Sequence, residues 1–289
     1  MLLALISERE RDFENMVNLH GLNNLSASKI MKPAIQLRAA IKCICFLMAC
    51  IAANAAPFEF QSSPQETSLL ELYTSESCSS CPPAEAWLSK LKSSSGLWSE
   101  FVPVAFHVDY WNNLGWKDKL SDEQYTERQQ QYAAQWSAQD IYTPEFVLNG
   151  REWHDWLGFR GAPSFAASQP GVLQVKSDDG KHWVAVFSPT PGETSGYEIS
   201  AAMLASDLDS NVSAGENAGR HLNHDFAVIS LITRPMNIQT NGIVGKFIID
   251  PQPKGIAGRF ALAIWVAREG QLEPIQATGG WLTKPQQSQ

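Results

Sequence analysis

The sequence predicts an α/β domain followed by a β-rich, sandwich-like C-terminal domain, and two features of the chain lead to this prediction. Between residues 69 and 168, short apolar strands alternate with helical patterns, which is typical of a layered α/β fold. From about residue 170, apolar segments are separated only by turn residues, which indicates strands without helices. We therefore expect an α/β domain over residues 57–169 and a β-rich domain over residues 170–289.

The composition is that of a globular protein with an acidic balance. Of the 289 residues, 44% are hydrophobic and 18% are charged, so the chain has enough apolar mass for a core. The net charge of −8 argues against a nucleic-acid partner, because binding to phosphates needs a basic face.

Residues 31–55 carry the pattern of a secretory signal peptide. Basic residues come first, then an apolar segment, then small residues around Ala55 that suit cleavage. The apolar segment is too short to span a bilayer. Residues 1–30 are then an extension that is absent if translation starts at Met31 instead of Met1. We expect a secreted or periplasmic protein.

Cysteine usage fits an exported chain. Cleavage near residue 55 removes Cys43, Cys45 and Cys50 and leaves only Cys78 and Cys81. An exported chain with one C-x-x-C pair is not using disulfides as a scaffold. One alternative stays open, because the residues before Cys50 resemble a bacterial lipobox. In that case Cys50 carries a lipid and the protein is a membrane-anchored lipoprotein.

The segment around the C-x-x-C pair predicts a strand, a turn and a helix in that order. Residues 69–73 form an apolar strand, and Pro82 and Pro83 suit a first helical turn, where a missing N–H costs little. Apolar residues from Ala84 to Leu91 recur at helical spacing. Both thiols then lie at the N-terminus of a helix, where the helix dipole favours a thiolate.

A second strand and a second helix are expected next. Residues 101–109 are apolar enough for a buried strand, which makes a parallel β-α-β unit with the first strand. After an aromatic loop over residues 110–119, Ser121 is expected to cap a helix that runs to about Trp136, with Gln124 as its capping-box partner. This helix is so polar that we expect it on the surface.

The third expected strand lies in residues 141–150 and ends in an Asn-Gly turn, which is a strong hairpin signal. A closing helix is expected over residues 158–168, and a long polar loop over residues 207–224. The strands expected in the β-rich domain are residues 172–176, 183–188, 197–202, 226–233, 246–249 and 260–267.

Five motifs along the chain resemble one known family. They are ELYTSESCSSCPPAEAWL, AFHVDYWNNLGWKD, YTERQQQYA, YTPEFVLNGR and GENAGRHLNH. In this order they resemble the secreted thioredoxin-like proteins catalogued as domain of unknown function 1223, over roughly residues 68–285. The resemblance implies a thioredoxin-like domain with a β-rich C-terminal extension. It also implies a cis bond between Thr143 and Pro144, which would sit against the C-x-x-C pair and expose the Thr143 backbone to a peptide strand.

Two positions depart from the usual thioredoxin-like pattern. Ser77 stands where an aromatic residue usually precedes the first cysteine. Leu72 stands at the position of the usual buried acid, and Glu71 is one residue away. Glu71 is therefore displaced by one residue from the position of the usual proton acceptor for the thiol.

The pattern predicts thiol–disulfide exchange at Cys78 and Cys81. Cys78 is expected to attack a disulfide, and Cys81 to resolve the mixed disulfide, with Thr143 and Pro144 completing the catalytic set. The substrate is then a disulfide of a protein or a small thiol, and no organic cofactor is needed. The alternative is a static disulfide that staples the turn, although closing so short a loop gains little entropy.

Two other functions stay open. Cys78, Cys81 and His107 form a ligand set that suits Cu(I), which predicts a metal-handling protein. The second of these functions is that of a non-catalytic binding module in which the β-rich domain recognises the partner. His107 is otherwise a structural histidine under an aromatic cover. The residues of this cover form either a substrate-binding lip or part of the core: Tyr110, Trp111 and Trp116.

A second polar concentration surrounds residues 215–224. His221 and His224 lie three residues apart, which is a metal spacing only if the segment is helical. The segment is therefore interpreted either as a docking surface or metal site on the β-rich domain, or as a solvated loop whose glycines enable turns.

Overall fold

The computed structural model describes residues 57–157, 168–190, 196–240, 242–251 and 255–282. The signal peptide and the Cys50 anchor, which were predicted within residues 1–55, lie outside these ranges. So does the helix predicted over residues 158–168, except for its last residue. None of the helices in the described ranges is long and apolar enough to cross a membrane.

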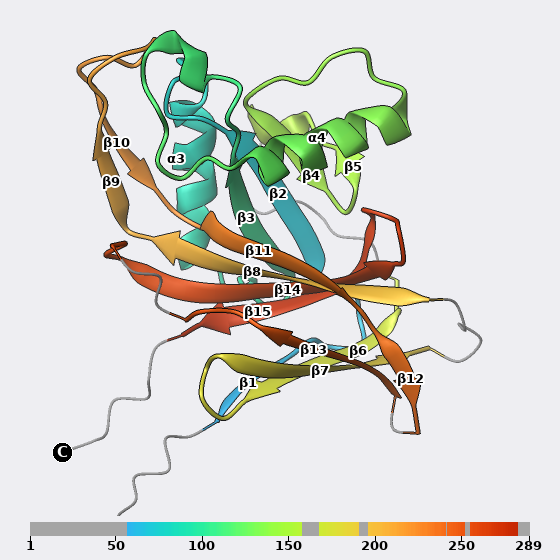
Figure 1. Ribbon diagram of the computed structural model, residues 1–289. Coiled ribbons are helices and arrows are strands. Elements are labelled where there is room, and N and C mark those ends of the chain that lie inside the picture. The colour runs from blue at the N-terminus through green and yellow to red at the C-terminus, as the bar shows by residue number, and fades with distance from the viewer. Residues whose placement is uncertain (1–56, 158–167, 191–195, 241, 252–254, 283–289) are drawn as a thin grey trace, which may run out of the picture. The chain divides into compact units, whose positions relative to one another are not determined.

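Two β-sheets and two α-helices make up most of the described structure (Figure 1). The larger sheet has the strand order β15-β14-β8-β11-β3-β2-β4-β5, and the smaller sheet has the order β1-β6-β7-β13-β12. The strands are β1 Phe58–Gln61, β2 Ser68–Thr74, β3 Phe101–His107, β4 Glu145–Leu148, β5 Arg151–Glu152, β6 Gly171–Ser177, β7 His182–Pro189, β8 Tyr197–Ser206, β9 Leu208–Asn211, β10 His221–His224, β11 Ala227–Pro235, β12 Asn237–Gln239, β13 Gly242–Ile248, β14 Arg259–Arg268 and β15 Pro274–Trp281. The helices are α3 Pro82–Lys90 and α4 Glu123–Trp136, with short 3-10 turns at Leu91–Ser93, Asn112–Leu114 and Asp155–Leu157.

The predicted β-α-β unit is confirmed. Strands β2 and β3 pair in parallel from Ser68 opposite Phe101 to Thr74 opposite His107, and α3 lies between them in sequence. Every residue of both strands is buried, as expected for parallel strands that are covered on both faces. This pairing places the C-terminal ends of both strands at one edge of the sheet, beside the start of α3.

Helix α3 begins as the sequence predicts. Cys81 is its N-cap, and Pro82 and Pro83 occupy the first helical positions. The apolar face expected from the spacing is buried at Ala84 and Leu88.

Helix α4 differs from its prediction at its N-terminus. Its N-cap is Asp122, whose carboxylate accepts a hydrogen bond from the Gln124 backbone N–H at 3.0 Å, so the assignment of Ser121 was wrong by one residue. The Ser121 hydroxyl instead donates to the Asp118 carbonyl. The helix lies at the surface as expected, with Glu127 exposed on its outer face, and its inner face buries Arg128 and Tyr132.

The predicted hairpin is confirmed between β4 and β5. These strands pair in antiparallel fashion around Asn149 and Gly150, which have φ values of 48° and 76°. Such positive φ values at both turn residues match the twist of the flanking strands, which explains why Asn-Gly is a strong signal. Strand β4 also pairs with β2, antiparallel, and so extends the sheet on the side opposite β3.

Both sheets run across the boundary expected at residue 170. Strand β11 adds to the free edge of β3, in parallel, with Ala227 opposite Ala105. Strand β1, from the start of the described chain, pairs with β6 in the smaller sheet. The described residues from 57 to 282 accordingly belong to one compact unit. An unpaired edge at β3 would expose backbone N–H and C=O groups, and β11 removes that edge.

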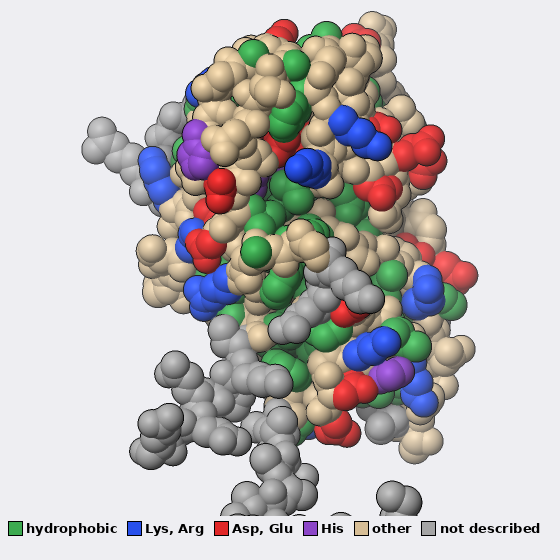
Figure 2. Space-filling model, turned by 60° about the vertical axis from the view of Figure 1, so that its left-hand side comes forward, with side chains coloured by type: hydrophobic (Ala, Val, Ile, Leu, Met, Phe, Trp, Pro, Cys, Tyr) green, Lys and Arg blue, Asp and Glu red, His purple; other side chains and the backbone are tan. Residues whose placement is uncertain are grey.

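The core follows the period-two alternation of β8 and β14. Ala202 and Leu204 face one side, where they join a core shared with β2, β3 and both helices. Ile199 and Met203 face the other side and pack with the smaller sheet around Trp183. Strands that are apolar on both faces therefore separate two cores. Figure 2 shows that acidic and basic side chains are interspersed on the face that it draws.

The long polar loop expected over residues 207–224 contains a hairpin instead. Strands β9 and β10 pair from Leu208 opposite His224 to Asn211 opposite His221. Strand β10 also lies against α3. The sequence HLNH alternates exposed and buried residues, as one covered face of a strand requires. This hairpin brings the second polar concentration to the C-x-x-C segment.

Candidate functional site

A disulfide joins Cys78 and Cys81 at the N-terminus of α3. The two cysteines are 1% and 0% exposed, whereas Ser79 and Ser80 between them are exposed. The Cys81 carbonyl accepts hydrogen bonds from the backbone N–H groups of the first helical turn. The structure therefore places both cysteines at the helix N-terminus, as the sequence predicts. Cys78, however, is almost completely buried, whereas the sequence analysis expects an exposed nucleophile.

The segment around Thr143 lies against this disulfide. The Sγ atom of Cys78 is 3.7 Å from the Thr143 carbonyl oxygen, and the Ser80 hydroxyl donates to the same oxygen at 3.4 Å. The Thr143–Pro144 bond is cis, as the resemblance implies. The indole N–H of Trp111 donates to the Thr143 hydroxyl at 2.8 Å and so fixes this segment from the other side.

The three aromatic residues expected to form a lip are all half-buried. Trp116 donates its indole N–H to Glu76 Oε2 at 2.5 Å, and Tyr110 donates to Gln129 at 3.4 Å. Burial raises the pKa of Tyr110 to about 12. Their polar atoms therefore support the site from inside. The aromatic loop over residues 110–119 and the segment over residues 141–150 expose two other large side chains, Leu114 and Tyr142, whose exposed fractions are 41% and 42%. The sequence analysis did not single these out.

The loop between β9 and β10 holds the C-x-x-C turn. The Glu216 carboxylate accepts from the Ser79 backbone N–H at 3.1 Å and from its hydroxyl at 2.7 Å. These bonds lower the pKa of Glu216. Asn217 is fully buried and donates to the carbonyls of Glu76 at 2.9 Å and Cys78 at 2.8 Å. The interpretation of this segment as a merely solvated loop was therefore wrong.

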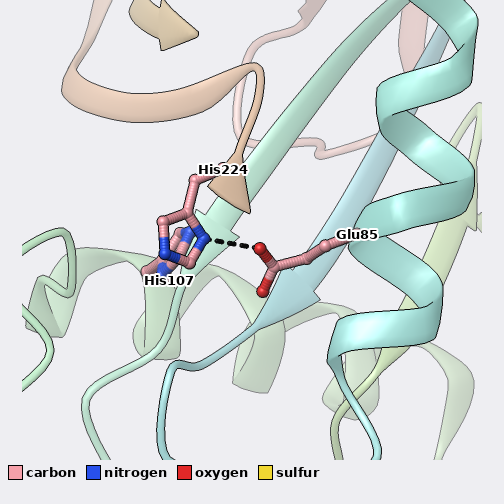
Figure 3. Close-up of side chains that lie close together, drawn as sticks. All are labelled: Glu85, His107 and His224. Carbon is pink, nitrogen blue, oxygen red and sulfur yellow. Dashed lines mark hydrogen bonds and ion pairs between the residues drawn. The ribbon is translucent and has the colours of Figure 1, made fainter. Parts of the chain in front are cut away.

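A cluster of buried polar side chains lies at the ends of β3 and β10 and on α3. We call it the buried histidine cluster, and it consists of Glu76, Glu85, His107, Asp118 and His224, which are all at most 6% exposed. His107 Nδ1 lies 2.7 Å from Asp118 Oδ2, and His224 Nδ1 lies 2.6 Å from Glu85 Oε2. Figure 3 shows Glu85, His107 and His224 converging on one another from these three elements.

Charges of opposite sign stabilise one another in this cluster. Burial alone would lower the pKa of His224, but contacts with Glu76 and Glu85 outweigh it and raise that pKa to about 10. Burial and Asp118 oppose each other in the same way at His107, whose pKa is raised. Burial would raise the pKa of Asp118, but the neighbouring His107 lowers it. Both histidines therefore favour the charged form in this structure.

His107 belongs to this cluster. Among the described residues, one group of His, Cys, Asp and Glu side chains is close enough to hold a metal ion, and it consists of Glu85, His107 and His224. Neither Cys78 nor Cys81 is part of it, so the structure does not group the alternative copper ligands together.

The two histidines of β10 have separate environments. His221 is exposed and His224 is 1% exposed, because residues three apart in a strand point to opposite faces. The i, i+3 spacing would have paired them only in a helix. In the described structure only His224 reaches the buried cluster.

Glu71 is a structural carboxylate. Its two oxygens accept hydrogen bonds from Arg128 at 2.7 and 3.0 Å, and the Tyr132 hydroxyl donates to it at 2.6 Å. Glu71 is completely buried. Its lone pairs are therefore used by α4, on the face of β2 that points away from Thr74 and Glu85.

Sequence reasoning missed three polar residues near the disulfide, which are Glu76, Glu85 and Asp118. Glu76 stands two residues before Cys78, and Glu85 four residues after Cys81 on the helix that it opens, so proximity in sequence was the signal available for these two. Glu216 and Asn217 lie in the second polar concentration that the sequence singled out, but their contacts with the C-x-x-C turn could not be read from it.

Comparisons with known proteins bear on the fold and family. A family described as "Protein of unknown function (DUF1223)" matches residues 69–266. Comparison with curated proteins found no match. A crystal structure of a protein from Agrobacterium tumefaciens is similar, with a TM-score of 0.50 and 21% identity over 78% of this chain and 97% of that chain. HBP35 of Porphyromonas gingivalis also matches, with a TM-score of 0.47 and 13% identity over 79% of each chain. The Agrobacterium likeness concerns the fold alone.

Proposed function

Because the chain belongs to the DUF1223 family, whose description states no reaction, we propose its function from the site: an exported, thioredoxin-like thiol–disulfide oxidoreductase that uses Cys78 and Cys81. The observation that carries this proposal is the disulfide at the N-terminus of α3 with the Thr143 carbonyl 3.7 Å from Cys78 Sγ. A helix N-terminus favours the thiolate that either direction of exchange requires.

The exchange balances without an organic cofactor. A substrate thiolate attacks Cys78 Sγ, the bond between the two cysteines breaks, and Cys81 leaves as a thiolate. A second substrate thiolate then releases Cys78, and two electrons have passed from the substrate to the pair. In the opposite direction, the reduced pair converts a substrate disulfide to two thiols. The proposed substrates are disulfides or thiols of proteins or small molecules.

Access to the sulfur is the step that the geometry constrains. Cys78 is 1% exposed, whereas the neighbouring Ser79 and Ser80 are exposed. The two hydrogen bonds from Ser79 to Glu216 lie at the surface. In the proposed mechanism these two bonds break and the substrate then lies along Thr143 and Pro144. The half-buried Trp111 holds that segment in place through its hydrogen bond to Thr143.

Export is part of the proposal. Residues 31–55 carry a signal-peptide pattern, and only Cys78 and Cys81 follow them. A single reversible cysteine pair suits a secreted or periplasmic exchange protein, since thiols that are not redox partners are rare there. A lipid on Cys50 would place the same activity at a membrane surface.

The test is a redox titration of the metal-stripped full chain in glutathione buffers. The thiols of Cys78 and Cys81 are counted by mass tagging at peptide level, which separates them from Cys43, Cys45 and Cys50. We expect a reversible potential between about −270 and −120 mV, the range of exchange catalysts. A pair that stays oxidised below about −300 mV would show a structural disulfide and overturn the proposal.

Two matched variants separate the roles of the cysteines. Cys81→Ser leaves Cys78 without a resolving thiol and is expected to accumulate a mixed disulfide with a disulfide substrate, whose second sulfur leaves as a thiolate. Cys78→Ser is expected to accumulate much less, because Cys81 is fully buried at the helix N-cap. Equal trapping by both variants would contradict the assignment of Cys78 as the attacking residue.

A further inference from the structure

The buried histidine cluster has the features of a metal site that is separate from the disulfide. We propose that Glu85, His107 and His224 bind a divalent transition-metal cation. These three residues offer ligand atoms that all lie within 4.8 Å of one another (Figure 3). They come from α3, the end of β3 and the end of β10, so three rigid elements fix their positions.

The Nε2 atom of His107 is available as a ligand for the proposed metal. Its Nδ1 atom is 2.7 Å from Asp118 Oδ2, and its Nε2 atom has no hydrogen-bond partner among the described residues, although the side chain is fully buried. A carboxylate on the far nitrogen is the arrangement that orients metal-binding histidines and makes them better donors. Asp118 is itself held, because it accepts from the Glu76 and Leu120 backbone N–H groups at 2.9 Å each.

The two glutamates are oriented in the same manner. The Thr74 hydroxyl donates to Glu85 Oε1 at 2.7 Å, and the Trp116 indole N–H donates to Glu76 Oε2 at 2.5 Å. The remaining oxygens, Glu85 Oε2 and Glu76 Oε1, lie 2.6 Å and 3.2 Å from the two nitrogens of His224. The Glu76 and His224 atoms of the second contact lack hydrogen-bond geometry and are otherwise unpartnered among the described residues. Glu85 Oε2 is therefore the carboxylate oxygen beside the proposed metal, whereas Glu76 contacts the other ring nitrogen of His224.

Charge balance also favours a cation. Glu76, Glu85 and Asp118 bring three carboxylates into the interior, and in the described structure their ion pairs are with His107 and His224. Buried carboxylates are destabilising unless opposite charges compensate them. A dication bound to two neutral imidazoles contributes the same charge as two protons on those rings. It would replace the hydrogen bond between His224 and Glu85 by two coordinate bonds.

The ligand types define the class of metal. Two imidazole nitrogens and carboxylate oxygens suit Zn²⁺ and similar divalent ions of the first transition series, not Cu(I), which prefers sulfur. A surface groove borders the site at Glu85. A groove of about 500 Å³ runs between α3 and β10, and its lining includes Pro82, Glu85, Ala86, His221 and Asn223. Glu85 is the cluster member that borders this groove.

The test uses Zn²⁺ alone and the chelator-stripped full chain, titrated against a chromophoric competitor. We expect one Zn²⁺ per chain with a Kd tighter than about 1 µM. His107→Gln and His224→Gln are each expected to weaken binding by more than about 100-fold, since even outer-shell changes cost 10- to 100-fold. His221→Gln is the matched control, because His221 lies on the same strand but is exposed, and it is expected to bind as the parent does. Cys78→Ser/Cys81→Ser is also expected to retain Zn²⁺, which separates this proposal from the redox function.

A spectroscopic measurement on the unmodified protein covers the case in which a histidine variant does not fold. X-ray absorption at the zinc edge is expected to show nitrogen and oxygen ligands at about 2.0–2.2 Å and no sulfur at about 2.3 Å. Sulfur in the first shell would move the site to the cysteines and overturn the proposal. So would the absence of stoichiometric Zn²⁺ binding by the stripped chain, or equal loss of binding in His221→Gln.

Discussion

Replacing Arg128 with Met tests whether Glu71 is structural. Arg128 binds both oxygens of Glu71, and its guanidinium lies 5.7, 5.2 and 5.3 Å from the ring centroids of Phe106, Tyr132 and Trp265. Met keeps most of the apolar stem but removes the charge. Glu71, which is 0% exposed, is then left as a buried carboxylate with only tyrosine hydroxyls as partners.

The expected loss follows from that unpaired charge. Breaking a buried ion pair by removing one partner costs about 3–5 kcal/mol. For a unit of this size, each kcal/mol lowers Tm by about 2–4 °C, so the expected shift is roughly 6–20 °C. Glu71→Leu alone should cost a similar amount, because Arg128 is then the unpaired group. The double variant should lose clearly less than the sum, with a coupling energy above about 1 kcal/mol.

The assay is urea unfolding of the parent, both single variants and the double variant at one pH. The redox potential of the cysteine pair is measured in parallel, and we expect it unchanged in Arg128→Met. Additive losses below about 1 kcal/mol would refute the reasoning about burial. A changed potential with intact folding would instead return Glu71 to the role of proton acceptor.

Three further predictions concern single positions. Burial raises the pKa of Glu145 from 4.5 to about 7. The folded state therefore binds this proton more tightly than the unfolded state, and the protein loses stability as the pH rises between these two values. Glu145→Gln should remove about 1–3 kcal/mol of this pH dependence, measured from unfolding curves at several pH values. Asn217→Ala removes the side-chain donor to the Glu76 and Cys78 carbonyls, and the Cys78 carbonyl keeps only the Cys81 N–H; this should cost about 1–3 kcal/mol, and dithiothreitol should reduce the disulfide faster. Gly171→Ala should lower Tm much more than Gly219→Ala, because both have positive φ but a Cβ at Gly171 would lie 2.1 Å from a carbonyl oxygen and one at Gly219 would meet nothing within 4 Å.

Local signals explain which elements could be predicted. The strand before Cys78, the prolines that open α3 and the Asn149-Gly150 turn each act within a few residues, and the structure has all three. The hairpin of β9 and β10 was missed because its residues are polar, and polar segments usually indicate loops. Its one buried face is covered by α3, which no local pattern shows.

The buried histidine cluster shows the limit of local reasoning. His107 was singled out because it ends a buried strand, and His224 because of its spacing from His221. Their partners depend on tertiary packing: His224 meets Glu85 across 139 positions of the sequence. Without the topology, His107 paired most simply with the nearby C-x-x-C motif, and this produced the copper alternative.

The β-rich half of the chain takes part in the site directly. Strand β11 closes the edge of β3, and the β9–β10 hairpin supplies Asn217 to the C-x-x-C turn and His224 to the buried cluster. Glu76 connects the two, because its carbonyl accepts from Asn217 and its carboxylate lies against His224. A change in the disulfide turn is therefore expected to reach the cluster through two residues of backbone. The α/β region alone therefore lacks Asn217, which binds the C-x-x-C turn, and His224, which belongs to the buried histidine cluster.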